Sequence, residues 1–334
     1  MGKAERMVGQ TAAAKIGDVN VGIVGSGYIA ERFAAEARHV AGARVMAVYN
    51  PRMEAARDFA DRWGLLGAFN SIDEMFRHVD AVYIASPCRF HEAQMMAALD
   101  AGVHVLCEKP MALDADLLRR GYALASAKGL TLLQAVKTAY CPGFIALTSL
   151  AKGSIGDVLA VDAAFTKLVV PGSWELSADG FSGSMLTLGS YPLLAVARLL
   201  GTDGARFSFN SVVRNAIDAF TRCTVAYSDG RSGSVRVGVR AKSEGDLVVT
   251  GSEGYIYAQA PWWQTRVWER RFEDPAVREE YRAPFEGSGL RYELAEFVRC
   301  IRLGETCSPF LTAEENIFMT AAMQGFREEA GHGA

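Results

Sequence analysis

Short apolar runs alternate with amphipathic segments from Val19 to about Thr138. Apolar runs of this length predict buried strands, and the helical periodicity between them predicts helices. The expected strands are Gly22–Gly25, Arg44–Tyr49, Asp80–Ser86, Val103–Cys107 and Leu130–Val136, and the expected helices are Ile29–Val40, Met53–Trp63, a short one opened by Ser71, His91–Ala101 and Asp114–Lys128. Such alternation is typical of an α/β Rossmann fold, a doubly wound parallel sheet whose ligands lie outside the carboxyl ends of its strands.

The pattern changes after Thr138, where strand-like segments dominate. Strands are expected at Val158–Val170, Phe207–Val213, Ala219–Tyr227, Ser232–Val239, Gly245–Thr250 and Tyr255–Ala258, and helices at Ser184–Leu200, Leu290–Arg302 and Glu314–Glu329. This arrangement predicts an α+β domain with a large, mostly antiparallel sheet. We therefore expect a flexible leader over residues 1–17, a nucleotide-binding domain over 18–138 and a second domain over 139–334.

The first expected strand runs directly into a glycine turn that opens a helix. Gly25 permits a tight turn, and Gly27 lets the backbone approach a pyrophosphate closely. The N-terminus of the next helix offers free N–H groups and the positive end of its dipole to the same anion. The turn therefore predicts a dinucleotide site formed by Gly25, Ser26, Gly27, Tyr28 and Ile29.

The end of the second strand, Asn50-Pro51-Arg52, bears on which dinucleotide is bound. A carboxylate at this place hydrogen-bonds the 2′-hydroxyl of NAD, and no acid is present here. The Asn50 amide can bond either form, whereas the Arg52 guanidinium can neutralise a 2′-phosphate. We expect NADP rather than NAD, and a merely solvated Arg52 is the alternative interpretation.

Composition limits the partners of the chain. The 334 residues carry a formal net charge of −3 without a basic run, which argues against nucleic acid and membrane surfaces. The longest apolar stretches are far shorter than the ~20 residues that cross a bilayer, and residues 1–17 lack the apolar core of a secretion signal. The six cysteines show no paired spacing, so we expect no metal site, no disulfide and a cytoplasmic location.

Two further strand ends carry polar residues that face the same ligand cleft. One is Ser86-Pro87, followed by His91, and the other is Glu108-Lys109-Pro110. A lysine beside a nicotinamide ring can hold a substrate hydroxyl and stabilise the alkoxide as hydride leaves. Partial burial and the positive ring would lower its pKa and suit it to proton transfer. Glu108 can orient Lys109 or contact the nicotinamide ribose, and His91 either contacts the cofactor or only caps its helix.

The glycine turn, the strand end Ser86-Pro87 with His91, and above all Glu108-Lys109-Pro110 resemble the Gfo/Idh/MocA family of oxidoreductases. The resemblance extends to Gly183-Ser184-Met185-Leu186-Thr187-Leu188-Gly189-Ser190-Tyr191 and to Tyr292-Glu293 with Phe297, so it covers nearly the whole chain. It implies an NAD(P)-dependent enzyme with a cis-proline at Pro110. It also implies a second domain that binds substrate and pairs copies of the chain into a homodimer or homotetramer.

The second half of the implied site departs from the family pattern. Many relatives carry an aspartate and, four residues later, a histidine or tyrosine on the same helical face. These positions are Thr187 and Tyr191 here, and the tyrosine resembles the branch of glucose-fructose oxidoreductase and dihydrodiol dehydrogenase. The resemblance implies Lys109 and Tyr191 as the catalytic pair. Thr187 can hydrogen-bond a sugar hydroxyl but carries no charge, and a core position for Tyr191 is the alternative.

Other polar and aromatic residues are expected near the cleft. Lys137 follows the sixth strand, and three positions before it Gln134 stands where relatives often have glutamate. Trp174 precedes the glycine-rich segment and can stack on nicotinamide or on a sugar face. We expect Lys137, Trp174, Thr187 and Tyr191 to contact substrate, whereas Trp262-Trp263 are as readily explained as core or interface residues.

These observations predict an NAD(P)-dependent oxidoreductase that moves a hydride between nicotinamide and a secondary alcohol or ketone of a sugar, sugar derivative or cyclitol. The alternative is a nucleotide-binding sensor or regulatory protein of the same fold with little or no turnover, which the missing acid at Thr187 favours. A third interpretation keeps an enzyme but changes its chemistry, to a tightly held cofactor recycled between two substrates or to reduction of a carbon–carbon double bond.

Overall fold

The first sheet carries the amino-terminal half of the molecule. The computed structural model describes residues 17–330, so the expected leader lies outside the described residues except for Gly17. Six parallel strands pair in the order β3-β2-β1-β4-β5-β6, which confirms the doubly wound sheet. Their bounds are β1 (Val19–Val24), β2 (Ala43–Tyr49), β3 (Gly67–Phe69), β4 (Ala81–Ile84), β5 (His104–Glu108) and β6 (Leu132–Ala135).

Helices cover both faces of this sheet, as right-handed crossover connections require. The connecting elements are α1 (Tyr28–Ala37), α2 (Met53–Trp63), α3 (Ile72–Phe76), the 3₁₀ turn η1 (Cys88–Phe90), α4 (His91–Asp100) and α5 (Ala115–Lys128). Phe33 of α1 and Phe59 of α2 share one apolar cluster with Ile23 of β1. Met95 of α4 and Leu118 of α5 belong to a second cluster, so α1 and α2 lie opposite α4 and α5.

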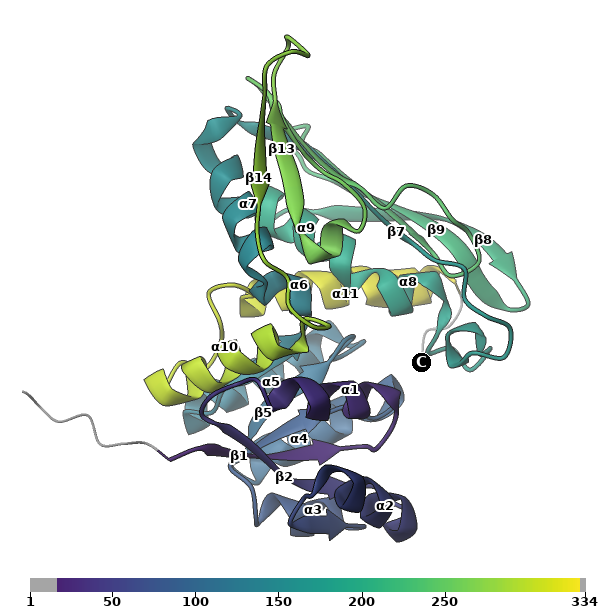
Figure 1. The fold of residues 1–334 in the computed structure, drawn as a ribbon. Helices are drawn as coiled ribbons and strands as arrows, with labels where there is room; N and C mark the ends of the chain where they lie inside the picture. Colours follow the sequence, from purple (N-terminus) through teal and green to yellow (C-terminus); the bar gives the residue numbers. More distant parts are fainter. Residues whose placement is uncertain (1–16, 331–334) are drawn as a thin grey trace, which may run out of the picture.

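Two helices from the end of the chain return to the first sheet. They are α10 (Leu290–Leu303) and α11 (Ala313–Glu329). Leu290, Leu294 and Phe297 of α10 are buried in the same cluster as Phe33 of α1. Figure 1 shows α10 against the first sheet and α11 between the two sheets. The carboxyl-terminal helices therefore complete the core that the first 138 residues begin.

The second sheet has eight strands in the order β14-β13-β12-β11-β7-β10-β9-β8. Only the β10–β7 pair is parallel, which confirms a mostly antiparallel sheet. The strands are β7 (Val158–Thr166), β8 (Arg206–Arg214), β9 (Ile217–Ala226), β10 (Ser232–Gly238), β11 (Leu247–Gly251), β12 (Tyr255–Ala258), β13 (Val267–Arg271) and β14 (Arg278–Arg282). Expected strand Val158–Val170 ends earlier, at Thr166, and an isolated bridge joins Leu168 to Arg240.

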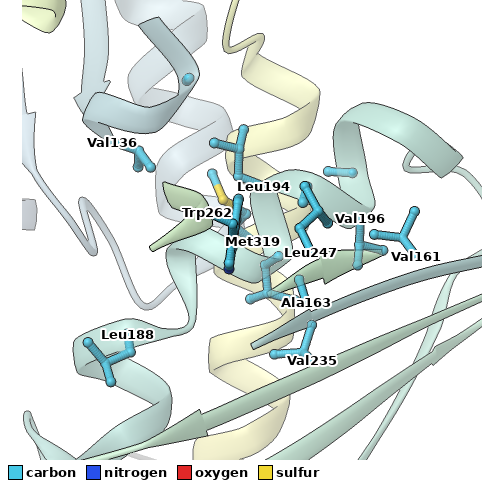
Figure 2. Close-up of a cluster of buried hydrophobic side chains, with 14 of the residues drawn as sticks. Val136, Val161, Ala163, Leu188, Leu194, Val196, Val235, Leu247, Trp262 and Met319 are labelled. Carbon is cyan, nitrogen blue, oxygen red and sulfur yellow. The ribbon is translucent and has the colours of Figure 1, made fainter. Parts of the chain in front are cut away.

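One face of the second sheet carries the helices and the larger core. These helical elements are α6 (Lys137–Tyr140), α7 (Pro142–Ser154), η2 (Trp174–Leu176), α8 (Gly183–Leu188), α9 (Ser190–Leu200) and η3 (Trp262–Gln264). Figure 2 shows Val161, Ala163 and Val235 of the sheet gathered with Leu194 of α9 and Trp262. The alternate residues of β10, such as Ser234 and Arg236, are only partly buried on the other face.

The expected helix Ser184–Leu200 is two helices, because α8 ends at Leu188 and α9 begins at Ser190. Pro192 has no N–H to donate to the carbonyl of Leu188 four residues earlier, so one continuous helix would lose a bond at this point. The junction residue Gly189 keeps a helical backbone, with a φ of −61° and a ψ of −30°. Within residues 17–330, no helix is both long enough and apolar enough to cross a bilayer.

Candidate active site

The glycine turn after β1 forms a cradle that fits a pyrophosphate. Gly25 has a φ of 99°, and a Cβ there would lie 3.0 Å from the carbonyl oxygen of Ala85. Gly27 is the N-cap of α1, and no side chain accepts from the first amides of that helix. A Cβ on Gly27 would meet no atom of the described residues within 4 Å, so the space beside this cap is open. Uncapped amides at a helix N-terminus are an anion site, which fits the expected dinucleotide.

The carboxyl end of β2 presents amide, hydroxyl and guanidinium groups. Asn50 Nδ2 donates to Ser26 Oγ at 2.8 Å, and its Oδ1 accepts from the backbone N–H of Arg52 at 2.9 Å. Asn50 thereby joins the glycine turn to the start of α2. The Arg52 side chain is exposed beside this link. The set contains donors and one cation but no carboxylate, a composition that fits a 2′-phosphate.

His91 joins two loops instead of presenting a ring nitrogen to the cleft. The imidazole is 2% exposed, and its nitrogens lie 2.8 Å from the carbonyl oxygens of Pro110 and Ser86. Burial lowers the pKa of His91, although both carbonyls favour the charged ring. Both ring nitrogens therefore lie against backbone carbonyls, and the expected contact of His91 with the cofactor stays a prediction. The Ser86 hydroxyl, beside Pro87, donates to Gln94 Oε1 at 2.6 Å.

Glu108 is held at the end of β5 by a buried tyrosine. Tyr83 Oη donates to Glu108 Oε1 at 2.6 Å, and the Lys109 N–H donates to Glu108 Oε2 at 3.2 Å. The ring of Tyr83 stacks on Phe33 of α1 with 3.6 Å between centroids. A carboxylate fixed on both oxygens places a negative charge beside the Lys109 amine, as expected for an orienting residue.

Lys109 reaches across from the first sheet to the second domain. Its Nζ donates to the carbonyl oxygen of Thr187 in α8 at 2.9 Å and lies 5.9 Å from the ring centroid of Tyr191. Burial lowers the pKa of Lys109, while the nearby Glu108 carboxylate opposes that shift. The Lys109–Pro110 peptide bond is cis, as the family resemblance implied.

Tyr191 and Thr187 lie on the helix pair that faces Lys109. Burial raises the pKa of the Tyr191 phenol, so its hydroxyl stays protonated at neutral pH. Thr187 is 4% exposed, and its Oγ1 has no hydrogen-bond partner among the described residues. The backbone of Thr187, rather than its side chain, therefore contacts Lys109. The structure brings together Lys109, Thr187 and Tyr191, which the sequence placed in separate halves of the chain.

An aromatic wall continues from Tyr191 along the second domain. Phe165 of β7 lies 5.1 Å from the Tyr191 ring and stacks on Trp263 at 3.6 Å between centroids. Trp262 is fully buried and donates from Nε1 to the carbonyl of Ala164 at 2.8 Å, so it is a core residue. Phe165 was missed from the sequence because β7 contains apolar residues on both faces, and no local signal separates it from the core.

Trp174 lies in the segment between β7 and α8 and is 63% exposed. The next residue, Glu175, forms an ion pair with Lys167 at 2.6 Å. Lys167 and Glu175 are both close enough to influence the Lys109 amine. An exposed indole can cover a bound ring, and the expected contact of Trp174 with substrate stays a prediction.

Lys137 is engaged by the segment that precedes α10. Its Nζ donates to the carbonyl oxygen of Ser288 at 2.8 Å and lies 5.9 Å from the ring centroid of Phe285. Burial lowers the pKa of Lys137, and the cation of Arg32 lowers it further. Lys137 therefore joins the end of β6 to the segment that precedes α10. This bond uses one of the three N–H donors of the ammonium group, which was expected to contact substrate.

The same segment is fixed to α1 by an ion pair. Arg291 Nε donates to Glu36 Oε2 at 2.8 Å, and the Ser288 N–H donates to Glu36 Oε1 at 3.1 Å. Both charged side chains are mostly buried. A Cβ at Gly287 would collide with the Glu36 carboxylate, so only glycine permits this approach. We refer to Glu36, Ser288 and Arg291 as the α1 clasp.

Gln134 supports the backbone beyond Lys109. Its Oε1 accepts from the Met111 N–H at 2.8 Å, and its Nε2 donates to Asn316 Oδ1 of α11 at 2.9 Å. Asn316 in turn donates to Tyr122 Oη at 2.7 Å. An amide can both accept and donate in this buried network, which a glutamate at position 134 could do only when protonated.

Within residues 17–330, no group of three His, Cys, Asp or Glu side chains has the arrangement of a metal site.

Both halves of the chain match models of known protein families. Residues 19–135 match the model of an oxidoreductase family with an NAD-binding Rossmann fold, and residues 146–257 match the GFO/IDH/MocA C-terminal domain. The chain belongs to the Gfo/Idh/MocA oxidoreductase family. The family assignment confirms the resemblance inferred from the glycine turn and Glu108-Lys109-Pro110.

Relatives within the Gfo/Idh/MocA family match along almost the whole chain. Trans-1,2-dihydrobenzene-1,2-diol dehydrogenase of Sus scrofa is 28% identical over 93% of this chain and 96% of its own length. The NADP(+) scyllo-inositol 2-dehydrogenase IolU of Bacillus subtilis is 26% identical over 94% and 97%. The crystal structure of KijD10, a 3-ketoreductase from Actinomadura kijaniata in complex with NADP and TDP-benzene, has a TM-score of 0.80 at 23% identity and covers 93% and 97% of the two chains, a likeness of fold.

Proposed function

We propose that the protein is an NAD(P)-dependent oxidoreductase that transfers a hydride between nicotinamide and a secondary alcohol or ketone of a small cyclic substrate. The observation that carries this proposal is the hydrogen bond from Lys109 Nζ to the Thr187 carbonyl beside Tyr191. It places an amine and a phenol together at the carboxyl ends of the first sheet's strands, where dinucleotides bind in this class of fold.

The residues of the chain have distinct roles in this proposal. The turn Gly25–Ile29 and the first amides of α1 hold the pyrophosphate, and the strand ends with Ser86-Pro87 and Glu108 line the rest of the cofactor cleft. The nicotinamide, when bound, supplies or accepts the hydride. In the oxidation direction neutral Lys109 accepts the hydroxyl proton as the hydride leaves, and in reduction its ammonium returns a proton to the oxygen. The Tyr191 hydroxyl donates a hydrogen bond to the same oxygen.

We infer that NADP(H) is preferred over NAD(H). Arg52 and Asn50 supply a cation and an amide where a carboxylate would repel a 2′-phosphate. The Bacillus subtilis relative is named for NADP(+), and the crystal structure of KijD10 contains NADP, which supports the same preference.

The substrate class follows from the aromatic wall and from Trp174. Phe165 and Trp263 form a flat surface next to Tyr191, and the Trp174 indole is exposed in the segment between β7 and α8. A ring with an apolar face and hydroxyl edges, such as a sugar derivative, cyclitol or cyclic diol, suits this combination. The named substrates of the two relatives, a dihydrobenzene diol and scyllo-inositol, belong to that class.

A nucleotide-binding sensor with little or no turnover is the second candidate. One observation favours it, because Thr187 contributes no charge and its buried hydroxyl has no hydrogen-bond partner within residues 17–330. The intact pair Lys109 and Tyr191 favours the enzyme.

One experiment separates the two candidates. Purified protein is titrated with NAD, NADH, NADP and NADPH in a thermal-shift assay, where ligand at 100-fold over its Kd stabilises by about 2.7 kcal/mol. Sugars, cyclitols and cyclic diols are then screened with the preferred nucleotide by absorbance at 340 nm. Binding with turnover supports the enzyme, and binding without turnover across the screen supports the sensor.

We also propose a cytoplasmic homodimer or homotetramer. All six cysteines are free thiols, which is ordinary in a reducing compartment. The outer face of the second sheet, with Ser234 and Arg236 partly buried, is the surface we expect to pair. Light scattering coupled to size exclusion tests the oligomer, and a charge substitution at Ser234 should weaken it.

A further inference from the structure

A buried aspartate on the second sheet holds the start of α8. Asp218 of β9 is 7% exposed. Its carboxylate accepts from the backbone N–H groups of Ser184 at 3.0 Å and Met185 at 2.8 Å. It also accepts from the hydroxyls of Ser184 and Thr221, each at 2.8 Å. The Ser184 hydroxyl also lies within hydrogen-bond distance of the Asp218 backbone carbonyl, so its one proton is shared between the two acceptors. Burial raises the pKa of Asp218, and the donors from Thr221, Met185 and Ser184 oppose that shift because they favour the ionised form.

The chain is shaped to admit this aspartate. Gly183 has a φ of 89°, and a Cβ there would collide with the Asp218 carboxylate. The N-cap residue of α8, Ser182, makes no side-chain bond to the first turn of its own helix. Asp218 therefore replaces the usual local cap from a different element of the fold.

The other end of α8 carries the contact with Lys109. The helix has six residues, Gly183–Leu188, and the carbonyl of Thr187 lies in its last turn. That carbonyl accepts from Lys109 Nζ at 2.9 Å. In so short a helix, the segment that Asp218 fixes and the segment that Lys109 contacts are two residues apart. Displacement of the first turn therefore displaces the Thr187 carbonyl.

We propose that Asp218 is a positioning residue for Lys109, acting through α8 and the Thr187 carbonyl. The inference rests on the proposed function, in which Lys109 transfers the proton. It explains how the site tolerates threonine at position 187, because the backbone carbonyl supplies the lysine's partner on this side and Asp218 holds that carbonyl in place. The other titratable groups around the amine include Glu108, Lys167, Glu175, Cys88, Glu293, Lys137, His91 and Tyr191.

The test measures the pKa of Lys109 in the full chain with Asp218→Asn. The asparagine keeps the volume, but its NH₂ would face N–H or O–H donors, so α8 loses part of its anchor. A carbonyl acceptor favours the protonated amine, so its displacement should lower the Lys109 pKa by about one unit. Competitive labelling with acetic anhydride across pH, quantified at Lys109 by mass spectrometry, measures this directly. Turnover should fall about 10- to 100-fold, as expected when a reacting group is misplaced.

Two further variants control for stability. Glu296→Gln changes another buried carboxylate, which accepts from Arg299 and Cys300 of its own helix and from Ser308, and touches none of the site residues. It should lower thermal stability and leave the Lys109 pKa unchanged. Thr221→Val removes a single bond to Asp218 and should shift the Lys109 pKa in the same direction by less, which keeps the test available if Asp218→Asn does not fold.

The outcomes separate the two proposals. An unchanged Lys109 pKa in folded Asp218→Asn overturns the positioning role, and so does an equal shift in Glu296→Gln. The labelling needs no substrate, so absence of turnover in the unaltered protein counts against the proposed function alone.

Discussion

Lys109 Nζ donates to the carbonyl oxygen of Thr187 at 2.9 Å, across 78 residues of sequence. The acceptor is a neutral backbone atom at the position where the family pattern has an aspartate. A neutral acceptor holds the amine without adding a negative charge, so burial keeps the pKa of Lys109 below its ordinary value. The amine is therefore easier to deprotonate than one paired with a second carboxylate.

Lys109→Met should remove turnover and leave nucleotide binding intact. Methionine fills the same space but can neither hold the substrate oxygen nor move a proton, so kcat should fall by about 10²–10⁴-fold. NADPH affinity, measured by fluorescence titration, should change little. Lys152→Ala, an exposed lysine at the end of α7, is the control and should keep normal kcat. Normal turnover in Lys109→Met would place the chemistry elsewhere.

Tyr191→Phe should lower activity without moving the alkaline limb of its pH profile. In the reduction direction a proton must be donated, so the rate falls as pH rises through the pKa of the donor. Burial lowers the pKa of Lys109 and raises that of Tyr191, so the lysine loses its proton first. Initial rates from pH 6 to 11 check this.

The alkaline limb should therefore persist at the same pH in Tyr191→Phe, at reduced height. Should the limb disappear in that variant, the tyrosine rather than the lysine would be the proton donor. Glu108→Gln, which removes a charge that raises the Lys109 pKa, should move the limb to lower pH.

Arg52→Ala should weaken NADPH binding selectively. A hydrogen bond to a charged group contributes about 1.5–3 kcal/mol, so the loss of the guanidinium should raise the Kd for NADPH roughly tenfold or more. The Kd for NADH should stay within about twofold of the unaltered value, because no 2′-phosphate is present. Isothermal titration with both nucleotides measures the ratio, and equal losses for both would make Arg52 a merely solvated residue.

Substitution of the two glycines of the turn by alanine should have different effects, on stability at Gly25 and on nucleotide binding at Gly27. Gly25→Ala forces a side chain into a φ of 99° against Ala85, so it should cost thermal stability. Gly27→Ala meets no protein atom within 4 Å, so it should fold normally yet weaken the nucleotide that occupies that space. Melting temperature and nucleotide Kd, measured on both variants, resolve the contrast. Gly64→Ala, a helix C-cap remote from the turn, is the control for backbone strain alone.

Glu36→Gln should destabilise the α1 clasp in a pH-dependent way. Burial alone would raise the pKa of Glu36, but Arg291 and the Ser288 amide outweigh it and hold the pKa below 4.5. The carboxylate therefore contributes stability fully above pH 4.5, and the contribution is lost as pH falls through the lowered pKa. The variant should melt a few degrees lower at pH 7.

That difference should shrink steadily in melts recorded below pH 4.5. A constant difference across pH would show that volume, and not charge, holds the segment against α1. Asp116→Asn, an exposed surface carboxylate, is the matched control and should match the unaltered protein at every pH.

The sheet of the first domain was predictable because β1, β4 and β6 are short runs buried on both faces, and β2 ends in an apolar run. Strand β3, of three residues, and strands β13 and β14 were missed for physical reasons. In β13 and β14 the residues from Glu269 to Arg271 and from Arg278 to Arg282 are mostly charged, so no apolar period marks them. The break between α8 and α9 could have been anticipated from Pro192 alone.

The candidate site was predictable where a motif carried it and not where the fold assembled it. Gly25, Asn50 and Lys109 directly follow strands, Glu108 ends one, and all four lie where strand ends must meet. The hydrogen bond from Lys109 to a carbonyl of Thr187, and the use of both nitrogens of His91, involve backbone atoms that every residue possesses. The residue type cannot reveal such partners, because every residue at position 187 would present the same backbone carbonyl.

Helix α10 gives the molecule a property that a linear division of the chain does not suggest. Leu290, Leu294 and Phe297 are buried with Phe33 beneath the nucleotide-binding sheet, and the α1 clasp fixes the entry to that helix. A fragment ending at residue 138 would leave this apolar surface uncovered and should aggregate. Exchange of substrate domains between relatives would have to replace residues 139–283 and retain the chain from Pro284 onward. The amino-terminal half therefore has a complete hydrophobic core only when the carboxyl-terminal helix α10 packs against it.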